Sequence, residues 1–404
     1  MNRISGKKFL ALFGCSLILT IAYMSLSSWG LAIPFLSETF QLNGIMIQLG
    51  NAALIAGYAV GSFIEGRLLN RWGWKKTFLF AMALFLIGSI LIPFVESYPI
   101  IIVLRFLMGF GLIVNITTFI VSGWFPLAQR GLAVGVLLGC IGLGTALGGF
   151  VTGALTELFS WQNIFLILAA VTIAGMVIFL LIVGNPPRQD KTDADPKGRA
   201  FRGDIYKQPA LWLFALSLLF VFFNVYGLYA YLASYMQTLG YSVAETGLIV
   251  LFNGLVAVAS TPFGGYLSDW LVKKTGNVVR ARAYAIAFSG ALVGVAGCLL
   301  IPLLAPISIG FAILTALISG WGCPAANSPI LSLPSDIFGS EAAGAANGMV
   351  ILVAGIGGIL SPILVPYIAE ATNWTVGWII TAAAAFACMI ISLILPHIRV
   401  RNEE

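Results

Sequence analysis

The sequence is poor in charge and nearly lacks histidine. Charged residues make up 9% of its 404 residues and hydrophobic residues 60%, whereas soluble domains average about 25% charged residues. The five cysteines lie in apolar stretches without a Cys-x-x-Cys pair, and the single histidine is His397. This scarcity predicts neither a disulfide framework nor a metal site. It also argues against an enzyme, which would need a nucleophile, a base or metal ligands inside the apolar stretches.

Two further classes of partner are not expected. The sequence has no glycine-rich phosphate-binding loop ending in Lys-Ser or Lys-Thr, so we predict neither ATP as an energy source nor any other cofactor. The formal net charge of +6 is spread over many short segments. Nucleic acid, which needs basic residues gathered on one face, is therefore not a predicted partner.

Apolar runs cover nearly the whole chain. A helix needs about 20 residues to cross about 30 Å of hydrocarbon. Because a bilayer interior accepts only backbones that satisfy their own hydrogen bonds, and no alternating strand pattern competes, the runs predict an all-α polytopic membrane protein. Twelve runs are long enough: 9–35, 44–66, 77–95, 100–124, 131–156, 163–184, 209–237, 243–268, 281–304, 306–332, 342–369 and 375–396.

The basic residues fall almost entirely in alternate gaps between these runs. All but one of the 21 lie before the first run, after the last, or in or at the border of the second, fourth, sixth and eighth gaps. Cytoplasmic loops retain Lys and Arg, so both termini and these gaps are predicted to be cytoplasmic. We expect a multi-pass protein of the inner, cytoplasmic membrane, with the anionic leaflet of the lipid bilayer as the partner of this charge.

The chain also contains an internal repeat. At an offset of 213 residues, Gly131 matches Gly344 and Trp161 matches Trp374, and the ends of the second and eighth runs match at an offset of 199. Such a repeat predicts two pseudo-symmetric six-helix bundles with a solute site between them. The predicted domains are residues 1–184, a hydrophilic cytoplasmic linker over 185–208, and residues 209–404 with a short tail.

Three segments resemble signatures of the major facilitator superfamily. The loop signature G-x-L-x-D-R-x-G-R-K-K is similar to residues 66–76, and a second copy is similar to residues 265–269. The fourth-helix signature R-x-x-x-G-x-G resembles residues 105–111. The resemblance extends over the whole chain and implies a twelve-helix secondary transporter that works by alternating access.

In that family the loop signature implies a conformational latch, in which a carboxylate holds basic residues and a helix end in the outward-facing state. The acidic position is Asn70 here, so Glu65 is the candidate to replace it by pairing with Arg71 or Arg130. Exposed pairs contribute only about 0–1 kcal/mol each, so a latch of this kind would bias the equilibrium without locking it. The predicted latch residues are Glu65, Gly66, Asn70, Arg71, Gly73, Arg130 and Asp269.

Arg105 is the one basic residue that the topology places well inside a run, since Arg282 lies at the very start of its run. A charge at that depth is costly and marks a functional site by default, so we predict a role in substrate binding or proton relay. Snorkelling to the outer interface is the alternative. The middles of the runs otherwise contain no Asp, Lys or His. The sequence therefore leaves open whether a proton or a sodium ion is the coupling ion.

Other segments resemble organic-anion branches of the superfamily. Residues 124–133 are similar to a segment of monocarboxylate and oxalate/formate-type carriers, and residues 267–274 and 333–338 are similar to anion:cation symporters. Such carriers usually bind a carboxylate through an arginine in the first or eighth helix. The matching positions here are Leu26 and Thr261, so an anion would have to meet Arg105, helix N-termini or hydroxyl groups.

A cavity between the halves would be lined by the first, fourth, seventh and tenth runs, with the eighth and eleventh as gates. Polar and aromatic side chains cluster there, and amides and phenols orient a small molecule without charge. The predicted substrate-binding residues are Tyr23, Ser27, Trp29, Arg105, Asn115, Asn224, Tyr226, Tyr229, Asn253, Trp321, Asn327 and Asn347.

The sequence thus predicts a monomeric secondary transporter for a small organic anion such as a monocarboxylate. Efflux of an amphiphilic or drug-like compound is the alternative, and the charge-poor aromatic cavity favours it. The antiporter signature of the fifth run is broken, because Cys140 stands in place of a glycine and Thr145 in place of the proline. That departure argues against the efflux alternative.

Overall fold

The computed structural model describes residues 2–42, 44–155, 158–186 and 204–397. Within these ranges the chain is helical and has no β-strand, which confirms the predicted all-α fold. Among the described residues, eleven helices are long and apolar enough to cross a membrane. One of them spans 46 residues, Leu49–Phe94, and its length of about 69 Å is enough for two crossings of about 30 Å. The twelve predicted runs are therefore all accounted for.

The first six crossings are built from six α-helices. The second and third are joined without a loop at Gly73, whose φ of 75° and ψ of 166° reverse the chain, a conformation that glycine adopts without strain. The fourth crossing is divided between two helices. The helices are α1 (Asn2–Phe40), α2 (Gly44–Leu91), α3 (Tyr98–Phe110), α4 (Val114–Trp124), α5 (Leu127–Leu155) and α6 (Trp161–Ile182), with a short 3-10 turn η1 (Ile92–Phe94).

The last six crossings follow the same plan. Gly339, with φ of 81° and ψ of 169°, reverses the chain between the tenth and eleventh crossings. The ninth crossing contains a π-helical turn. The elements are η2 (Ile205–Lys207), α7 (Pro209–Thr238), α8 (Val243–Thr275), α9 (Val278–Tyr284), η3 (Ala285–Ala291), α10 (Leu292–Leu304), α11 (Ile309–Ala371), α12 (Trp374–Ile394) and η4 (Leu395–His397).

Several helices begin and end at residues whose chemistry fixes the boundary. α8 starts with a capping box in which the Ser242 hydroxyl accepts from the Glu245 backbone N–H and the Glu245 carboxylate accepts from the Ser242 backbone N–H. It ends at Gly276, which adopts the left-handed conformation. Asn373 caps the start of α12. These caps satisfy backbone groups that would otherwise be unpaired at the helix ends.

The two sets of six crossings meet along two helix pairs, α5 with α8 and α2 with α11. An equivalent hydrogen bond lies beside each pair, between α11 and α5 and between α4 and α11. Ser328 donates to the Gly131 carbonyl oxygen at 2.5 Å, and Asn115 donates to the Gly344 carbonyl oxygen at 3.3 Å. The two donors and the two acceptors are each 213 residues apart, the offset of the sequence repeat. Residues 187–203 of the predicted linker lie outside the described part of the chain.

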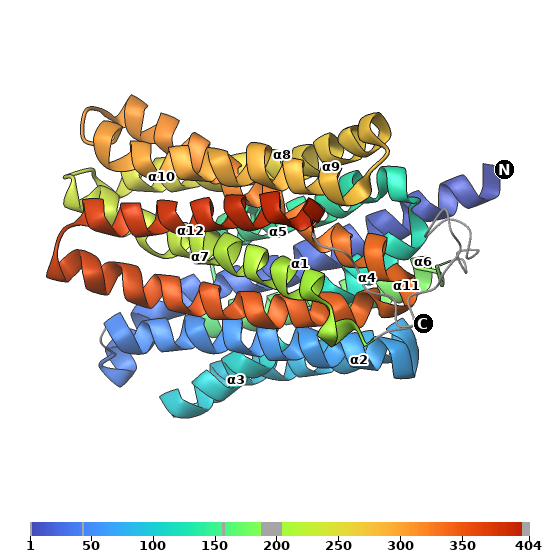
Figure 1. Cartoon of the computed structure of the whole chain (residues 1–404). Coiled ribbons are helices and arrows are strands. Elements are labelled where there is room, and N and C mark those ends of the chain that lie inside the picture. The colour runs from blue at the N-terminus through green and yellow to red at the C-terminus, as the bar shows by residue number, and fades with distance from the viewer. Residues whose placement is uncertain (1, 43, 156–157, 187–203, 398–404) are drawn as a thin grey trace.

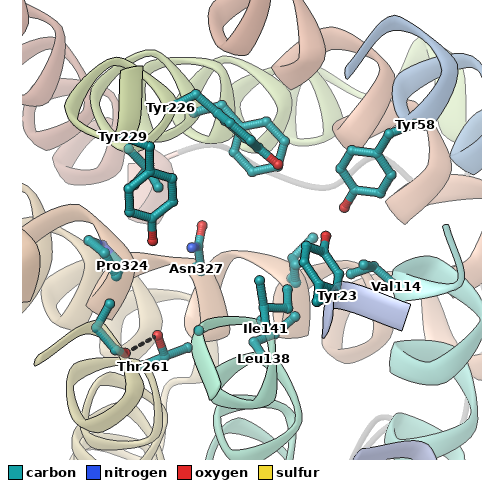
Figure 2. Close-up of a pocket in the computed structure, with 15 residues that line it drawn as sticks. Tyr23, Tyr58, Val114, Leu138, Ile141, Tyr226, Tyr229, Thr261, Pro324 and Asn327 are labelled. Carbon is teal, nitrogen blue, oxygen red and sulfur yellow. Dashed lines mark hydrogen bonds between the residues drawn. The ribbon is translucent and has the colours of Figure 1, made fainter. Parts of the chain in front are cut away.

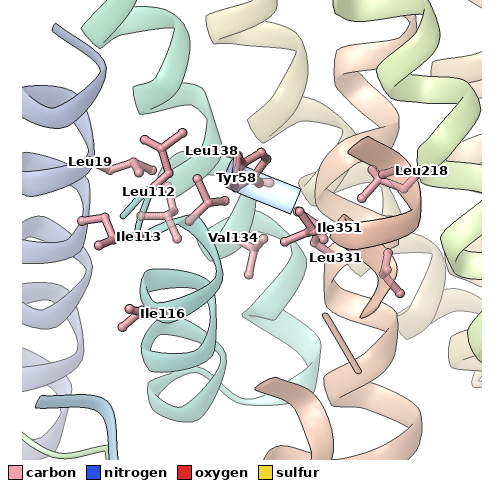
Figure 3. Packing of buried hydrophobic residues seen from close by; sticks show 14 of the residues in the cluster. Leu19, Tyr58, Leu112, Ile113, Ile116, Val134, Leu138, Leu218, Leu331 and Ile351 are labelled. Carbon is pink, nitrogen blue, oxygen red and sulfur yellow. The ribbon is translucent and has the colours of Figure 1, made fainter. Parts of the chain in front are cut away.

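The helices lie roughly side by side, and α1 begins at the same end of the bundle at which α12 ends (Figure 1). Buried leucine, isoleucine and valine side chains from α1, α4, α5, α7 and α11 form one cluster that reaches across both halves (Figure 3). Tyr58, Leu138 and Leu331 belong to this cluster and also line the central pocket described below. The hydrophobic core therefore forms part of the pocket wall.

Candidate functional site

A cavity lies between the two halves of the molecule. Its water-accessible volume is about 80 Å³, well above the about 10–15 Å³ that one water needs. Phenol and amide groups from four helices are directed into it (Figure 2). The lining residues are Tyr23, Tyr58, Val114, Leu138, Ile141 and Gly142 from the first half, and Phe222, Val225, Tyr226, Tyr229, Ala257, Thr261, Pro324, Asn327 and Leu331 from the second.

One wall of the pocket is a row of aromatic rings. Tyr58 of α2 stacks on Phe222 of α7 with centroids 6.3 Å apart, so this contact crosses between the halves. Phe222 meets Tyr226 edge to face at 5.1 Å, and Tyr226 meets Tyr229 in the same way at 6.4 Å. These are favourable geometries for aromatic pairs. The rings hold the phenol groups in place and give the wall an apolar surface.

The polar groups of the pocket are uncharged. The Oδ1 atom of Asn327 is buried and has no hydrogen-bond partner, so this amide is available to a ligand. The Thr261 hydroxyl donates instead to the Ala257 carbonyl oxygen of its own helix at 2.9 Å. Among the described residues that line the pocket, none is Lys or Arg. Recognition of a ligand here depends on phenol and amide hydrogen bonds.

Four of the predicted substrate-binding residues line this pocket: Tyr23, Tyr226, Tyr229 and Asn327. Tyr58 also lines it and is not among the predicted residues, because the predicted cavity walls and gates do not include the second run. Its signal in the sequence is weak but present. Gly57 and Gly61 on either side of it pack against the backbone of α3, which turns the tyrosine between them toward the neighbouring face of α2.

The other predicted asparagines contact neighbouring helices instead of the pocket. Asn224 donates to the Thr381 carbonyl oxygen at 3.4 Å, and Asn253 donates to the Ala316 carbonyl oxygen at 2.9 Å. Asn347 donates to the Leu331 carbonyl oxygen at 3.3 Å within α11. An amide in an apolar helix can satisfy itself on a neighbouring backbone as well as on a solute. These residues do not line the pocket in this conformation.

Trp321 and Asn115 also take packing positions. The Trp321 ring lies 5.1 Å from that of Phe263 in α8. Asn115 donates to the carbonyl oxygens of Ser62 and Gly344, at 2.8 and 3.3 Å. It therefore ties α4 to both helices of the α2–α11 contact between the halves.

Arg105 lies outside the pocket. Its guanidinium sits 4.3 Å from the centroid of the Trp29 ring, a cation–π contact, and its Nε donates to the Gly50 carbonyl oxygen at 3.4 Å. The side chain is 3% exposed, so it does not snorkel to an interface. Trp29 is thus a partner of Arg105 and not part of the pocket wall. The side chain of the remaining predicted residue, Ser27, lies outside the described part of the chain.

The end of the bundle that contains residues 71–76 and 273–280 carries four exposed lysines, and we call it the basic end. A buried network of ion pairs joins the halves there. Arg130 Nη1 of α5 lies 2.6 Å from Asp336 Oδ1 of α11, and Arg282 Nε of α9 lies 2.8 Å from Asp336 Oδ2. Arg282 Nη1 is 2.9 Å from Asp269 Oδ1 of α8. These four side chains, the basic-end network, are at most 6% exposed and cancel in charge.

Asp269 also binds the start of α5. Its carboxylate accepts hydrogen bonds from the backbone N–H groups of Gly131 and Leu132, at 3.1 and 2.8 Å. Charge-assisted bonds of this kind are roughly twice as strong as neutral ones. Since α5 belongs to the first half and α8 to the second, Asp269 joins the halves directly. Arg282, which contacts both carboxylates, holds them in position.

The predicted latch residues fall into separate groups. Arg130 and Asp269 belong to the basic-end network. Glu65 pairs with neither Arg71 nor Arg130, contrary to expectation, because Arg130 is turned toward Asp336 and the Glu65 carboxyl is buried in the α2 interface without a hydrogen-bond partner. Asn70 and Arg71 are exposed.

The two latch glycines have structural positions. Gly66 packs against the Gly344 carbonyl group of α11, where a Cβ atom would collide, and Gly73 forms the chain reversal described above. Sequence reasoning missed Arg282 and Asp336. Both lie near the ends of hydrophobic runs, where a charged residue is usually part of a loop. Asp336 belongs to residues 333–338, which resemble a segment of anion:cation symporters.

Comparisons with known proteins agree on one family. The family model described as Major Facilitator Superfamily matches residues 15–316 and 276–404. The probable sulfoacetate transporter of Cupriavidus necator is 26% identical, over 87% of this chain and 85% of the relative. The hexuronate transporter of Bacillus subtilis is 25% identical over 94% and 92%. A putative tartrate transporter of Agrobacterium vitis is 25% identical over 94% and 88%.

Solved structures of the same architecture superpose on the chain over nearly its full length. The proton:xylose symporter XylE has a TM-score of 0.78 at 16% identity, covering 97% of this chain and 96% of that one. The human organic anion transporter MFSD10 has a TM-score of 0.71 at 13% identity, covering 95% and 99%. At these identities the likeness concerns the fold.

Proposed function

Since the chain belongs to the Major Facilitator Superfamily, a family of multi-pass membrane transporters and not enzymes, we propose that it moves a small organic anion through the tyrosine-lined pocket by alternating access. The observation that carries the proposal is the position of the pocket. It lies between the halves, lined by both, and the basic-end network joins the halves on one side of it. The relatives named for sulfoacetate, hexuronate and tartrate favour a carboxylate or sulfonate as the solute.

The pocket offers the hydrogen bonds that a hydroxy acid needs. The phenols of Tyr58 and Tyr229 and the amide of Asn327 point into the same space (Figure 2). Phenol O–H and amide N–H groups donate to a carboxylate, and such bonds to charged groups contribute about 1.5–3 kcal/mol each. The unpartnered Asn327 Oδ1 accepts from a hydroxyl group of the solute. This division of donors and acceptor fits a small hydroxy acid.

The basic end is proposed to face the cytoplasm, in the inner membrane, because cytoplasmic loops retain Lys and Arg. The basic-end network then acts as the latch that keeps the cytoplasmic side closed. It replaces the predicted pairing of Glu65. Its parts are buried, so removing one of its charges costs the closed state about 3–5 kcal/mol, more than the loss of an exposed pair would. The latch residues we propose are Arg130, Asp269, Arg282 and Asp336.

Efflux of amphiphilic compounds is the second candidate, and one observation favours it. The pocket wall is aromatic and includes no Lys or Arg among its described lining residues. A lipophilic cation would meet the faces of Tyr58, Phe222 and Tyr226 favourably. Reconstituted protein distinguishes the candidates. Counterflow of labelled tartrate, glucuronate or sulfoacetate supports the anion proposal, whereas ethidium movement without anion counterflow supports efflux.

Pocket variants should weaken anion binding more than a variant of Arg105. We expect Tyr229→Phe, which loses a bond of about 1.5–3 kcal/mol to the carboxylate, to raise the apparent Kd for the transported anion by roughly 12- to 160-fold. Asn327→Ala, which loses a bond of about 0.5–1.5 kcal/mol to a hydroxyl group, should raise it by roughly 2- to 12-fold. Arg105→Met should change it by less than about 2-fold, since Arg105 contacts Trp29 and Gly50 outside the pocket. Isothermal titration in detergent measures all three. If Arg105→Met weakened anion binding more than the pocket variants do, Arg105 would belong to the substrate site.

A further inference from the structure

The carboxyl group of Glu65 is buried and has no partner. The side chain is 0% exposed, and neither Oε1 nor Oε2 makes a hydrogen bond. None of the ion pairs among the described residues includes it. A buried, unpaired charge is costly, and a carboxyl group in such a place takes up a proton to become neutral. In this conformation the surroundings of Glu65 therefore fit the protonated acid and not the carboxylate.

The described charged side chains on the helices packed against α2 either have other partners or are exposed. Arg105 of α3 faces Trp29 of α1. On α11, Asp336 is held by the two arginines of the basic-end network. No cation among the described residues thus offsets a negative charge on Glu65.

A line of polar groups leads from the pocket to Glu65. Tyr58, Ser62 and Glu65 are spaced by four and three residues, so they lie on one face of α2 over about 10 Å. Tyr58 lines the pocket. The Ser62 hydroxyl, like the Glu65 carboxyl, is buried without a partner. The residues of this line are two helical turns apart from end to end.

Helix α4 contributes further buried polar groups beside this face of α2. Asn115 donates to the Ser62 carbonyl oxygen at 2.8 Å, which places the two helices in contact at this level. The Asn115 Oδ1 and Thr118 Oγ1 atoms are also buried without partners. Buried polar atoms of this kind are normally satisfied by ordered water, which bridges two to four of them. A short chain of waters along Ser62, Asn115 and Thr118 would connect the pocket with Glu65.

We propose that Glu65 is the proton-binding site of a proton-coupled anion transporter, reached from the pocket along the Tyr58–Ser62 face of α2. This inference rests on the proposed function. A proton bound to one Glu65 carboxylate oxygen removes the negative charge of Glu65, so an anion held in a pocket whose described wall has no Lys or Arg does not face a second negative charge. Glu65 precedes Gly66, which packs on Gly344 of α11. Separation of α2 from α11 at the basic end exposes the acid to water, and the proton leaves as H⁺ on that side.

The test uses the full chain in proteoliposomes with Glu65→Gln and, as a matched control, Glu370→Gln, which alters an exposed acid of α11. The probe is whichever of labelled tartrate, glucuronate or sulfoacetate shows counterflow. For one proton with one monovalent anion, a gradient of one pH unit should drive about tenfold accumulation in wild type and in Glu370→Gln. Glu65→Gln, a neutral residue of nearly the same shape, should lose this accumulation and retain counterflow.

Two results would overturn the proposal while leaving the transport function intact. One is pH-driven accumulation that persists in Glu65→Gln. The other is wild-type counterflow that responds to a sodium gradient and not to a pH gradient. Infrared difference spectroscopy of the purified protein, after a pH step, needs no substrate. We expect a carboxylic-acid C=O band that is absent from Glu65→Gln and present in Glu370→Gln, and its absence from wild type would show that Glu65 binds no proton, whatever the solute.

Discussion

Asp336→Asn is expected to open the basic end of the bundle. The Asp336 carboxylate is fully buried and contacts Arg130 and Arg282 at once, at 2.6 and 2.8 Å. Without its charge, two buried cations face the single carboxylate of Asp269. Removing one partner of a buried pair costs about 3–5 kcal/mol. When the halves separate, both arginines become hydrated. The cost therefore applies to the closed state alone and shifts the equilibrium toward the open state by roughly 100-fold or more.

Spin labels on the two halves measure this opening. Lys76 and Lys274 are exposed at the basic end, one on each half, and serve as Lys76→Cys and Lys274→Cys. Cys140→Ser provides the background, since the other four cysteines are buried. We expect the distance distribution to gain a longer component in Asp336→Asn and to stay unchanged in Glu370→Gln. An unchanged distribution in Asp336→Asn would contradict a latch role.

A double variant tests whether charge balance is the cause. Arg130→Met with Asp336→Asn removes one cation and one anion, so Arg282 and Asp269 remain as a neutral pair at 2.9 Å. We expect this variant to recover part of the short-distance population that Asp336→Asn alone loses. A double variant as open as the single one would point to the shape of the Asp336 side chain, and not its charge, as the important property.

The number of crossings could be predicted because hydrophobicity is a local property of the sequence. Each span needs only a run of about 20 apolar residues. The boundaries between crossings were harder to predict from the sequence. Gly73 and Gly339 reverse the chain so tightly that adjoining helices follow one another without a loop. The predicted membership of the major facilitator superfamily is confirmed by the family match. The resemblance to this family could be recognised from the sequence because loop signatures also consist of contiguous residues.

The pocket was predicted only in part, for a physical reason. Tyr226 and Tyr229 line it, whereas Asn224, two residues before Tyr226 on the same helix, donates to α12. Residues two apart on a helix point in directions about 200° apart, and an apolar run in a membrane carries little information on which direction faces the cavity. Arg282 and Asp336 were missed for a related reason. Their pairing brings together residues 54 positions apart in sequence, and hydropathy alone assigned both to run ends.

Gly265→Ala is expected to keep the basic end from closing. A Cβ atom at Gly265 of α8 would collide with the Gly131 carbonyl group of α5. Overpacking of this kind costs about 1–3 kcal/mol. The backbone contact joins the two halves, so that collision is relieved when they separate, and the Ser328 hydroxyl, which also lies close to the Cβ position, can rotate away. We expect the protein to fold with near-normal thermal stability, to populate the open basic end in the Lys76→Cys and Lys274→Cys measurement, and to lose transport by roughly 5- to 150-fold.

Two neighbouring glycines of α8 provide the controls. A Cβ atom at Gly264 would collide with the Ala325 carbonyl group of α11, a contact within the second half, so Gly264→Ala should lower the melting temperature without favouring the open end. A Cβ atom at Gly254 would meet nothing within 4 Å, so Gly254→Ala should leave transport intact and stabilise the helix by about 0.4–1 kcal/mol. If Gly265→Ala lowered the melting temperature as much as Gly264→Ala and left the spin-label distances unchanged, the α5–α8 contact would be fixed throughout transport. Opening at the basic end would then have to occur along α2 and α11 alone.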